Sequence, residues 1–392
     1  MGKSSELYHN LMECPAYIKR GFDITEIQTH PAGNNEWLQF QSPQLRIVSS
    51  SLPDMPKRRF LSPRGMPPEE FTIIIPVEIN SKTIANLPKS TMPGIYLAYI
   101  GENWEIYING ELVQSAMHTT KRNWRDVYFP IDKDILIPGT NILAFRIAGD
   151  PTYVATGFYY SSSYYIDDYS VIKKRNQNIL LMLLCGIFGF TGACYLFIFL
   201  SIRKKDDIHN LYYSVFSFLL CIYSFMRTGI VNSIIPNSDI SIRLEFISLF
   251  MMIPILSLFI ESMVWRKITK SSIVYLILCS ILSVTQIFFS NQYGNDVLRI
   301  WGVTVVIYFS YVFFYNVVFS HYLMRQENKK QNKFDSKIVE TFSINMLVGS
   351  VLVYICGIID LFDTLFFHHS FGLFYTVTLC FTLEWQLHCP SA

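Results

Sequence analysis

Beyond about residue 175 the sequence is a series of long apolar runs separated by short charged clusters. The first run, Asn178–Ile202, contains no charged residue. An α-helix needs roughly 20 mainly apolar residues to cross the hydrocarbon core of a bilayer. We therefore predict an integral membrane protein whose seven transmembrane helices contact the lipid bilayer. Their expected ranges are 178–202, 209–230, 243–264, 273–290, 297–320, 338–359 and 370–387.

Lysine and arginine gather in alternate loops between the apolar runs. They follow the first, third and fifth runs, whereas the loops 291–296 and 360–369 contain neither residue. Positively charged loops favour the cytoplasmic side of a membrane. We therefore predict a multi-pass protein of the cell (inner) membrane, with an extracytoplasmic N-terminal domain and a cytoplasmic C-terminus.

The N-terminal half shows the pattern of short β-strands instead of long apolar runs. Asn109-Gly110 separates two such strands and is the strongest short signal for a β-hairpin, because both residues tolerate a positive φ. Several short strands with frequent turns favour an antiparallel β-sandwich. The expected strands are Phe71–Ile75, Ile95–Ile100, Trp104–Ile108, Glu111–Val113, Asp126–Ile131 and Asn141–Ile147.

These patterns predict a chain of class membrane α plus all-β, divided into three parts. Residues 1–45 form an N-terminal segment that we expect to be partly irregular, residues 46–172 an extracytoplasmic β-sandwich domain, and residues 173–392 the seven-helix domain. Only Cys14 precedes the first apolar run, so we expect no disulfide framework. Residues 1–40 show no apolar core of the kind that marks a secretory signal.

A family resemblance is carried by seven segments taken in their order along the chain. They are Trp104–Val113, Asn123–Val127, Pro138–Ile147, Gly149–Tyr153, Ile166–Tyr169, Arg243–Phe250 and Asp360–His368. The chain resembles the bacterial seven-transmembrane receptors with diverse intracellular signalling modules, as found in spirochaetes. The resemblance covers nearly the whole chain. It implies a jelly-roll-like, galactose-binding-like β-sandwich ectodomain, a seven-helix transducer and a cytoplasmic output such as a nucleotide cyclase or a histidine kinase.

We expect that output domain to be missing from this chain, because only a few residues follow the seventh predicted helix. Either the chain is a piece of a longer protein, or it signals through a separate cytoplasmic cyclase or kinase. The sequence shows no phosphate-binding Gly-rich loop, nucleophile elbow, zinc-protease helix or pair of catalytic carboxylates. We therefore predict that this chain is not itself an enzyme and that it uses no cofactor.

Charged residues also lie at the predicted outer ends of the helices. Ionisable groups in membrane spans usually face the bundle interior and pair with one another. We predict that these residues form a cluster that couples the ectodomain or a ligand to the helices. The alternative is that their side chains extend to the water at the membrane surface. The cluster comprises Arg227, Arg243, Glu245, Arg299, Asp360 and Asp363.

In the ectodomain the candidate ligand-binding residues are Tyr107, Trp124 and Arg125. Aromatic planes stack on the CH groups of sugars and arginine donates hydrogen bonds to hydroxyl groups, which suits a carbohydrate or another small ligand. The alternative is that alternate residues of these strands belong to the sandwich core. His368-His369 shows no fixed ligand spacing, so we predict no metal site.

These observations predict a membrane sensory receptor and signal transducer whose β-sandwich senses an extracytoplasmic ligand. Two other classes stay open. One is a transporter or channel, whose proton relay could use Glu261 and Glu340. The other is a glycan-binding membrane anchor that does not switch. Nucleic acid is excluded as a partner, because the basic stretch Lys57–Arg59 lies on the extracytoplasmic side in this interpretation. A homodimer also stays open.

Overall fold

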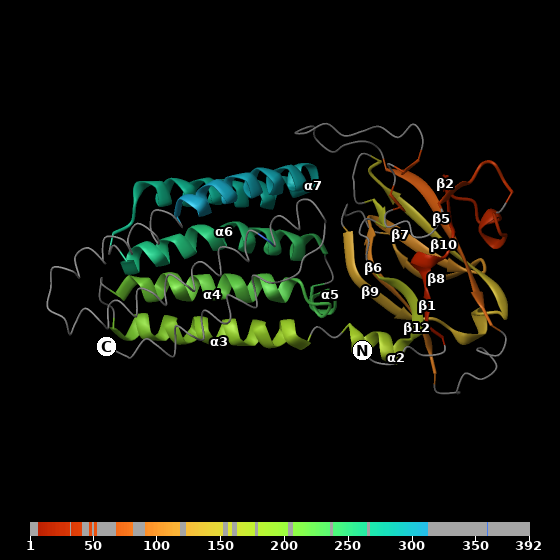
Figure 1. The fold of residues 1–392 in the computed structure, drawn as a ribbon, viewed down its shortest axis with the longest axis horizontal. Coiled ribbons are helices and arrows are strands. Elements are labelled where there is room, and N and C mark those ends of the chain that lie inside the picture. Colours follow the sequence, from red (N-terminus) through yellow and green to blue (C-terminus); the bar gives the residue numbers. More distant parts are fainter. Residues whose placement is uncertain are drawn as a thin grey trace. The chain divides into compact units, whose positions relative to one another are not determined.

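The computed structural model describes most of residues 7–312 and a single residue beyond them. The described residues are 7–31, 33–40, 47–48, 51–52, 68–80, 91–117, 123–151, 156–158, 163–176, 179–202, 207–235, 238–264, 267–312 and 359. The chain divides into two compact units. The first comprises Met1–Ile179, Thr228–Ile242 and Asn291–Tyr293, and the second Leu180–Arg227, Arg243–Ser290 and Gly294–Ala392. Strands dominate the first unit and helices the second (Figure 1).

The first unit contains two six-stranded antiparallel sheets, here named sheet A and sheet B. Sheet A runs in the order β1 (His9–Asn10), β12 (Tyr164–Asp168), β6 (Pro93–Gly101), β11 (Gly157–Phe158) and β4 (Ile47–Val48), with β9 (Asn123–Pro130) paired to β6. Sheet B runs in the order β3 (Leu38–Phe40), β2 (Ala16–Arg20), β5 (Glu69–Ile79), β10 (Gly139–Gly149), β7 (Asn103–Ile108) and β8 (Glu111–Ala116). The predicted all-β sandwich is therefore confirmed.

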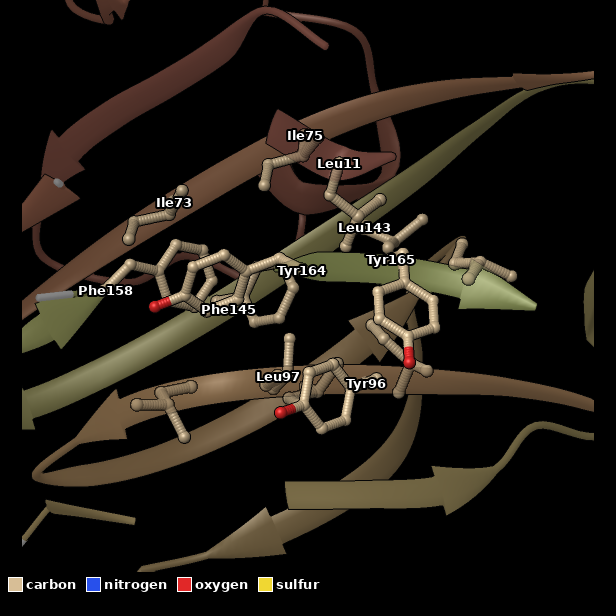
Figure 2. Close-up of a cluster of buried hydrophobic side chains, with 14 of the residues drawn as sticks. Leu11, Ile73, Ile75, Tyr96, Leu97, Leu143, Phe145, Phe158, Tyr164 and Tyr165 are labelled. Atoms are coloured by element: carbon tan, nitrogen blue, oxygen red, sulfur yellow. The ribbon is translucent and has the colours of Figure 1, made fainter. Parts of the chain in front are cut away.

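The hydrophobic core draws its side chains from both sheets. Alternate residues of a strand point to opposite faces, so Ile73 and Ile75 of β5 enter the core on the same side as Phe145 of β10. Figure 2 shows the aromatic centre of this core. There the ring of Phe158 lies 4.9 Å from that of Phe145 and 4.8 Å from that of Tyr164. Burial of these large rings adds to the apolar driving force that the aliphatic side chains of the core supply.

The predicted hairpin at Asn109-Gly110 is confirmed. Strands β7 and β8 flank it, and the two residues have φ values of 51° and 87°. Both values are positive, as a two-residue turn of type I′ requires. The Asn109 side chain also anchors the turn, because its amide group donates to the carbonyl oxygen of Ile135 at 2.8 Å and to Asn141 Oδ1 at 2.9 Å.

The N-terminal segment is more ordered than the sequence predicts, because it adds strands to both sheets. Residues 1–45 were expected to be partly irregular and separate, yet β1 pairs with β12 in sheet A while β2 and β3 join sheet B. These strands have only two to five residues. Short strands carry too little periodicity to be recognised locally, and their pairing partners lie far away in the sequence. The sandwich therefore begins at β1 and not at residue 46.

The helices follow the strands along the chain. They are α2 (Tyr169–Arg175), α3 (Ile179–Ile202), α4 (Ile208–Met226), α5 (Val231–Ile234), α6 (Ser238–Val264) and α7 (Lys270–Val312), with short 3-10 turns η1 (Leu11–Glu13), η2 (Glu26–Gln28) and η4 (Lys133–Ile135). In the described part of the chain, four helical segments are long and apolar enough to cross a membrane, namely Tyr169–Ile202, Ile208–Met226, Ile240–Ser262 and Lys270–Phe289. They correspond to the first four predicted spans.

Helix α7 is two helices that run antiparallel to each other. The backbone of Phe289 leaves the helical conformation, with φ −123° and ψ 15°. Beyond it the chain reverses, because the ring of Tyr308 stacks on that of Tyr275 at 3.8 Å. The second helix starts the predicted span 297–320 and is described as far as Val312. Apart from Ile359, the spans 338–359 and 370–387 lie outside the described residues, so the total of seven stays a prediction.

The turn at Gly110 gives a first testable prediction. A Cβ atom at Gly110 would be strained at φ +87° and would lie 2.7 Å from Cγ of Gln28. We expect Gly110→Ala to lower the free energy of unfolding of the sandwich by about 2 kcal/mol. Gly21 has a similar φ of +83° with no atom within 4 Å, so Gly21→Ala should cost only about 1 kcal/mol. Thermal unfolding of the full chain in detergent, followed by circular dichroism, tests the difference; equal losses would contradict it.

Candidate functional site

Helix α2 is the last element of the sandwich unit before the first apolar helix. Its N-terminus is capped by Asp168, whose carboxylate accepts hydrogen bonds from the Ser170 N–H at 2.7 Å and the Ser170 hydroxyl at 2.5 Å. The N–H of Tyr169 donates to the carbonyl oxygen of Met92 at 2.8 Å. The start of α2 is thereby fixed to the residue that precedes β6.

The middle of α2 packs directly on sheet A. Ile172 is fully buried in the sandwich core. A Cβ atom at Gly94 would lie 3.1 Å from Cα of Tyr169 and 3.2 Å from Cδ1 of Ile172. Only a residue without a side chain allows β6 and α2 to approach this closely without a shift of the helix. Gly94 is therefore the contact that seats α2 on the sheet.

The C-terminal end of α2 is held by an aromatic side chain of β12. The Asn176 amide donates to the Tyr165 hydroxyl at 3.2 Å, and the Arg175 guanidinium lies 5.4 Å from the centre of the Tyr165 ring. Burial raises the pKa of Tyr165, although Asn176 and Arg175 act in the opposite direction, so the phenol stays neutral at physiological pH. Tyr165 also contacts the rings of Tyr8 at 5.6 Å and Tyr96 at 5.0 Å.

This aromatic series ends at an acidic residue of β9. The Tyr96 hydroxyl donates to Asp126 Oδ1 at 2.6 Å. Burial, followed by the charge of Asp126, raises the pKa of Tyr96, so its hydroxyl remains a donor. Asp126 has a φ of 49°, a conformation that is uncommon for a residue with a side chain. The contacts thus run from α2 through Tyr165 and Tyr96 to β9.

The three sequence-predicted ligand residues do not lie together. Trp124 and Arg125 are adjacent on β9 of sheet A and are both half-buried. Trp124 packs edge-on against core residue Trp104, with ring centres 6.3 Å apart. Tyr107 lies on β7 of sheet B and is only 7% exposed, on the face opposite Trp104. Because side chains alternate along β7, Tyr107 cannot share a surface with Trp124.

Tyr107 belongs to a second apolar cluster on the outer face of sheet B. The N-terminal segment covers that face, contributing Ile27 and Trp37 with Phe22 packed at its edge. The Phe22 ring lies 5.3 Å from that of Tyr107. Sequence patterns did not predict this cluster, since its residues come from segments far apart in the chain. Ile74 of β5 was the one indication in the sequence of this cluster. It is an apolar residue on the outer face of the sheet, and such a residue is usually buried by another segment.

An arginine between two carboxylates stands at the edge of this second cluster. Arg146 of β10 donates to Glu70 Oε1 at 2.7 Å and to Glu105 Oε2 at 2.8 Å. Its guanidinium lies 4.8 Å from the centre of the Phe22 ring, and the Tyr107 hydroxyl donates to Glu105 at 2.9 Å. The three charges link β5, β10 and β7 across sheet B, so the arrangement acts as a structural clamp.

Four residues of the predicted coupling cluster are described. Arg243 of α6 donates from Nη1 to the carbonyl oxygen of Ile287 at 2.6 Å. That carbonyl stands beside the break at Phe289, at the C-terminal end of the first helix of α7, where carbonyls lose their helical partners. A cation at this end also interacts favourably with the helix dipole. Arg243, in the third predicted span, therefore caps the C-terminal end of the fourth.

The remaining members of that cluster have different environments. Glu245 is 5% exposed, whereas the Arg299 side chain is exposed. Arg227 ends α4 and donates to the hydroxyl of Tyr223 on the same helix at 2.9 Å. Asp360 and Asp363 lie outside the described residues. Coupling through this cluster stays a prediction.

A buried carboxylate organises the opposite end of α6. Glu261 is 0% exposed and accepts from the N–H and hydroxyl of Thr269, each at 2.8 Å, and from the Ser272 hydroxyl at 2.6 Å. The Tyr308 hydroxyl donates to Ser272 at 2.7 Å and lies 2.9 Å from the Ser257 hydroxyl. In the sequence, Glu261 was one of two acidic groups considered for the transporter alternative. In the structure it holds the connection between α6 and α7 at the N-terminus of α7, where negative charge is favoured.

Metal binding has no candidate within the residues that the structure describes, since these contain no group of three or more His, Cys, Asp or Glu able to hold an ion. His368-His369 lie outside those residues.

No family model matches the sequence, and no curated protein matches it. Among solved structures, the chain is similar to a member of glycosyl hydrolase family 2 from Bacteroides cellulosilyticus, with 16% identity and a TM-score of 0.28, over 41% of this chain and 20% of that one. It is also similar to a calcium-binding mutant of Bacteroides uniformis beta-glucuronidase 2, with 14% identity and a TM-score of 0.28, over 41% and 17% of the two chains. The chain thus spans about a fifth of the length of these structures. The assignment of the β-sandwich rests on the strand pairing within this chain and not on these similarities.

The Arg146 clamp gives a pH-dependent prediction. Partial burial raises the pKa of Glu105, but hydrogen bonds from Arg146 and Tyr107 outweigh this and hold the pKa below its usual range. A lowered pKa in the folded state means that the pair stabilises the fold above roughly pH 4.5 and that this stabilisation is lost as the pH falls further. Glu105→Gln should therefore destabilise the sandwich by about 2 kcal/mol near neutral pH and by much less near pH 3.

Thermal unfolding of the full chain across this pH range tests that prediction. Glu78→Gln is the matched control, since Glu78 is an exposed carboxylate on β5 of the same sheet. Its effect should stay within about 0.5 kcal/mol at every pH. A Glu105→Gln effect that does not change with pH would argue against the clamp.

The cap formed by Arg243 gives a third prediction. Arg243→Met removes the donor to the Ile287 carbonyl, so the last turn of the first α7 helix should fray. We expect amide hydrogen exchange over residues 287–290 to accelerate about fivefold, which corresponds to about 1 kcal/mol. Arg299→Met is the control, because Arg299 is exposed, and it should leave this segment unchanged. Equal acceleration in both variants would show that Arg243 does not act as a cap.

Proposed function

We propose that this chain is a membrane sensory receptor that senses an extracytoplasmic ligand with its β-sandwich and relays the signal through a seven-helix bundle. In this proposal the sandwich is a jelly-roll, galactose-binding-like domain outside the cell membrane, and the C-terminus is cytoplasmic. The output in this proposal is a cytoplasmic cyclase or kinase, as in the receptors that the sequence resembles. The alternate Lys and Arg loops and four apolar helices support this topology.

The seating of α2 on sheet A is the observation that carries the proposal. Gly94, Ile172 and Tyr165 fix α2 to strands of the sandwich, and Arg175 at its end is followed after three residues by Ile179 of α3. The four Cα steps from Arg175 to Ile179 can span no more than about 15 Å. In this proposal a ligand shifts β6 or β12, and the shift passes along this short stretch of chain to the start of the first span.

The ligand surface in this proposal lies along β9. The Trp124 ring is half-buried and offers its exposed part to a ligand, and β9 contacts the Tyr96–Tyr165 series that holds α2. Arg125 is the next residue, so its side chain points to the opposite face of β9 and does not share this contact. An aromatic ring that can stack on a sugar suits a carbohydrate. Tyr107 is left out of this surface, because it is buried under the N-terminal segment.

A readout on the predicted cytoplasmic side is offered by Thr269. Its N–H is held by Glu261 in the connection between α6 and α7, so rearrangement of these helices would change its hydrogen exchange. A ligand produces such a change only if its affinity differs between two states of the bundle.

The test uses the full chain in lipid nanodiscs. An oligosaccharide library is first screened by thermal shift, and each binder is then examined by hydrogen exchange over residues 267–272. We expect a binder to change that exchange and Trp124→Ala to abolish binding. Asn176→Ala, which removes the bond to Tyr165, should retain binding and weaken the exchange response.

Each class of function predicts a different result. Binding without any response at residues 267–272 would identify a non-switching anchor and refute the receptor. Movement of the sugar across liposome membranes would identify a transporter. Failure of every saccharide to bind would overturn the carbohydrate part of the proposal.

A further inference from the structure

Two cysteine thiols from different helices meet in the helical unit. Sγ of Cys185 on α3 lies 3.4 Å from Sγ of Cys221 on α4. The Cys185 thiol also lies 3.6 Å from the carbonyl oxygen of Cys221. Both cysteines are half-buried and in the thiol form. Packing alone does not require two thiols at one contact.

The contact depends on close approach of the two helix backbones. A Cβ atom at Gly189 would lie 3.3 Å from Sγ of Cys221, and one at Gly192 would lie 3.2 Å from the Phe218 ring. The Ser214 hydroxyl donates to the carbonyl oxygen of Gly192 at 2.8 Å. Small residues permit such approach between membrane helices. Gly189 thus makes the space in which Cys221 reaches Cys185.

The two thiols lie at the same depth in antiparallel helices. Cys185 is six residues after the start of α3 at Ile179, and Cys221 is five residues before the end of α4 at Met226. At 1.5 Å per residue these offsets are about 9 Å and about 8 Å. In a bilayer this depth is hydrocarbon, where an oxidant must be soluble in lipid. Organic hydroperoxides, including those of oxidised lipids, meet that condition.

We propose that Cys185 and Cys221 form a reversible oxidation site for organic hydroperoxides dissolved in the membrane. One thiol attacks the distal peroxide oxygen, the O–O bond breaks, and the thiol proton passes to the departing alkoxide to give an alcohol and a sulfenic acid. The second thiol attacks the sulfenic sulfur, forming the S–S bond and releasing water. The two electrons lost by the thiols reduce the peroxide, and a thiol reductant restores the pair.

The geometry requires only a local adjustment. The sulfur atoms must approach from 3.4 Å to about 2.05 Å, which side-chain rotation can provide when the helices already touch. The product joins α3 to α4 covalently and so fixes the first two spans relative to each other. This site goes beyond the proposed function and does not depend on the ligand or the output.

The experiment treats the full chain in liposomes with cumene hydroperoxide, a lipid-soluble organic hydroperoxide. Remaining thiols are then alkylated in denaturant, and peptides are analysed by mass spectrometry before and after reduction. We expect two thiols to be lost together and to reappear on reduction, with a linked peptide pair containing Cys185 and Cys221. Cys185→Ser and Cys221→Ser should abolish the linked pair, whereas Cys194→Ser, on the same helix α3, should retain it.

A pair of glycine variants tests the geometry without changing any thiol. Gly189→Leu should displace Cys221 and lower the linked fraction several-fold, whereas Gly186→Leu, at a position with no atom within 4 Å, should leave it unchanged. Circular dichroism checks that both variants are folded. If Gly189→Leu does not fold, the serine variants still test whether the link joins Cys185 to Cys221. Four results would each overturn the proposal: no link in the wild type, links only between chains, a link through Cys194, or equal linking in both glycine variants.

Discussion

The eleven-residue antiparallel ladder between β5 and β10 is the constraint on which the sandwich depends. It runs without interruption from the pair Gly139–Ile79 to the pair Gly149–Glu69. Side chains alternate across it, so the same two strands send Phe145 into the main core and Ile74 into the cluster beneath the N-terminal segment. A slip of one residue would exchange the two faces and disrupt the packing of both sets. The Arg146 clamp lies on this ladder, and β7 is aligned by it.

In the helical unit a different constraint operates. Its long apolar helices could cross a membrane, and inside a bilayer their backbone and side-chain polar groups would have no water to bind. The break at Phe289 leaves carbonyls at a helix end, and Arg243 donates to one of them. Glu261 likewise accepts three hydrogen bonds where α7 begins. Charges in apolar runs are usually taken as marks of function. These two have structural partners that any functional role must accommodate.

The sequence located all six of the strands that it predicted, because each lies in a segment with strong β-propensity or next to a clear turn signal such as Asn109-Gly110. It missed the strands of the N-terminal segment, the short strands β4, β11 and β12, and helix α2, which has only seven residues. The candidate site was recovered in part. Trp124 and Arg125 are neighbours on a half-buried strand, but Tyr107 faces another sheet surface. Strand assignment alone could not show this, since the face of a strand depends on which sheet it joins.

Local periodicity and run length were enough to determine the division into a β-rich half and an apolar helical half, because both are properties of consecutive residues. The tertiary structure alone decided which residues meet: the Gly94 approach that seats α2, the reversal within α7 that stacks Tyr308 on Tyr275, and the contact between Cys185 and Cys221. Each of these joins residues that are 33 or more positions apart. Such pairs leave no periodic signal in one sequence, since their selection rests on packing and hydrogen bonding between elements and not within them.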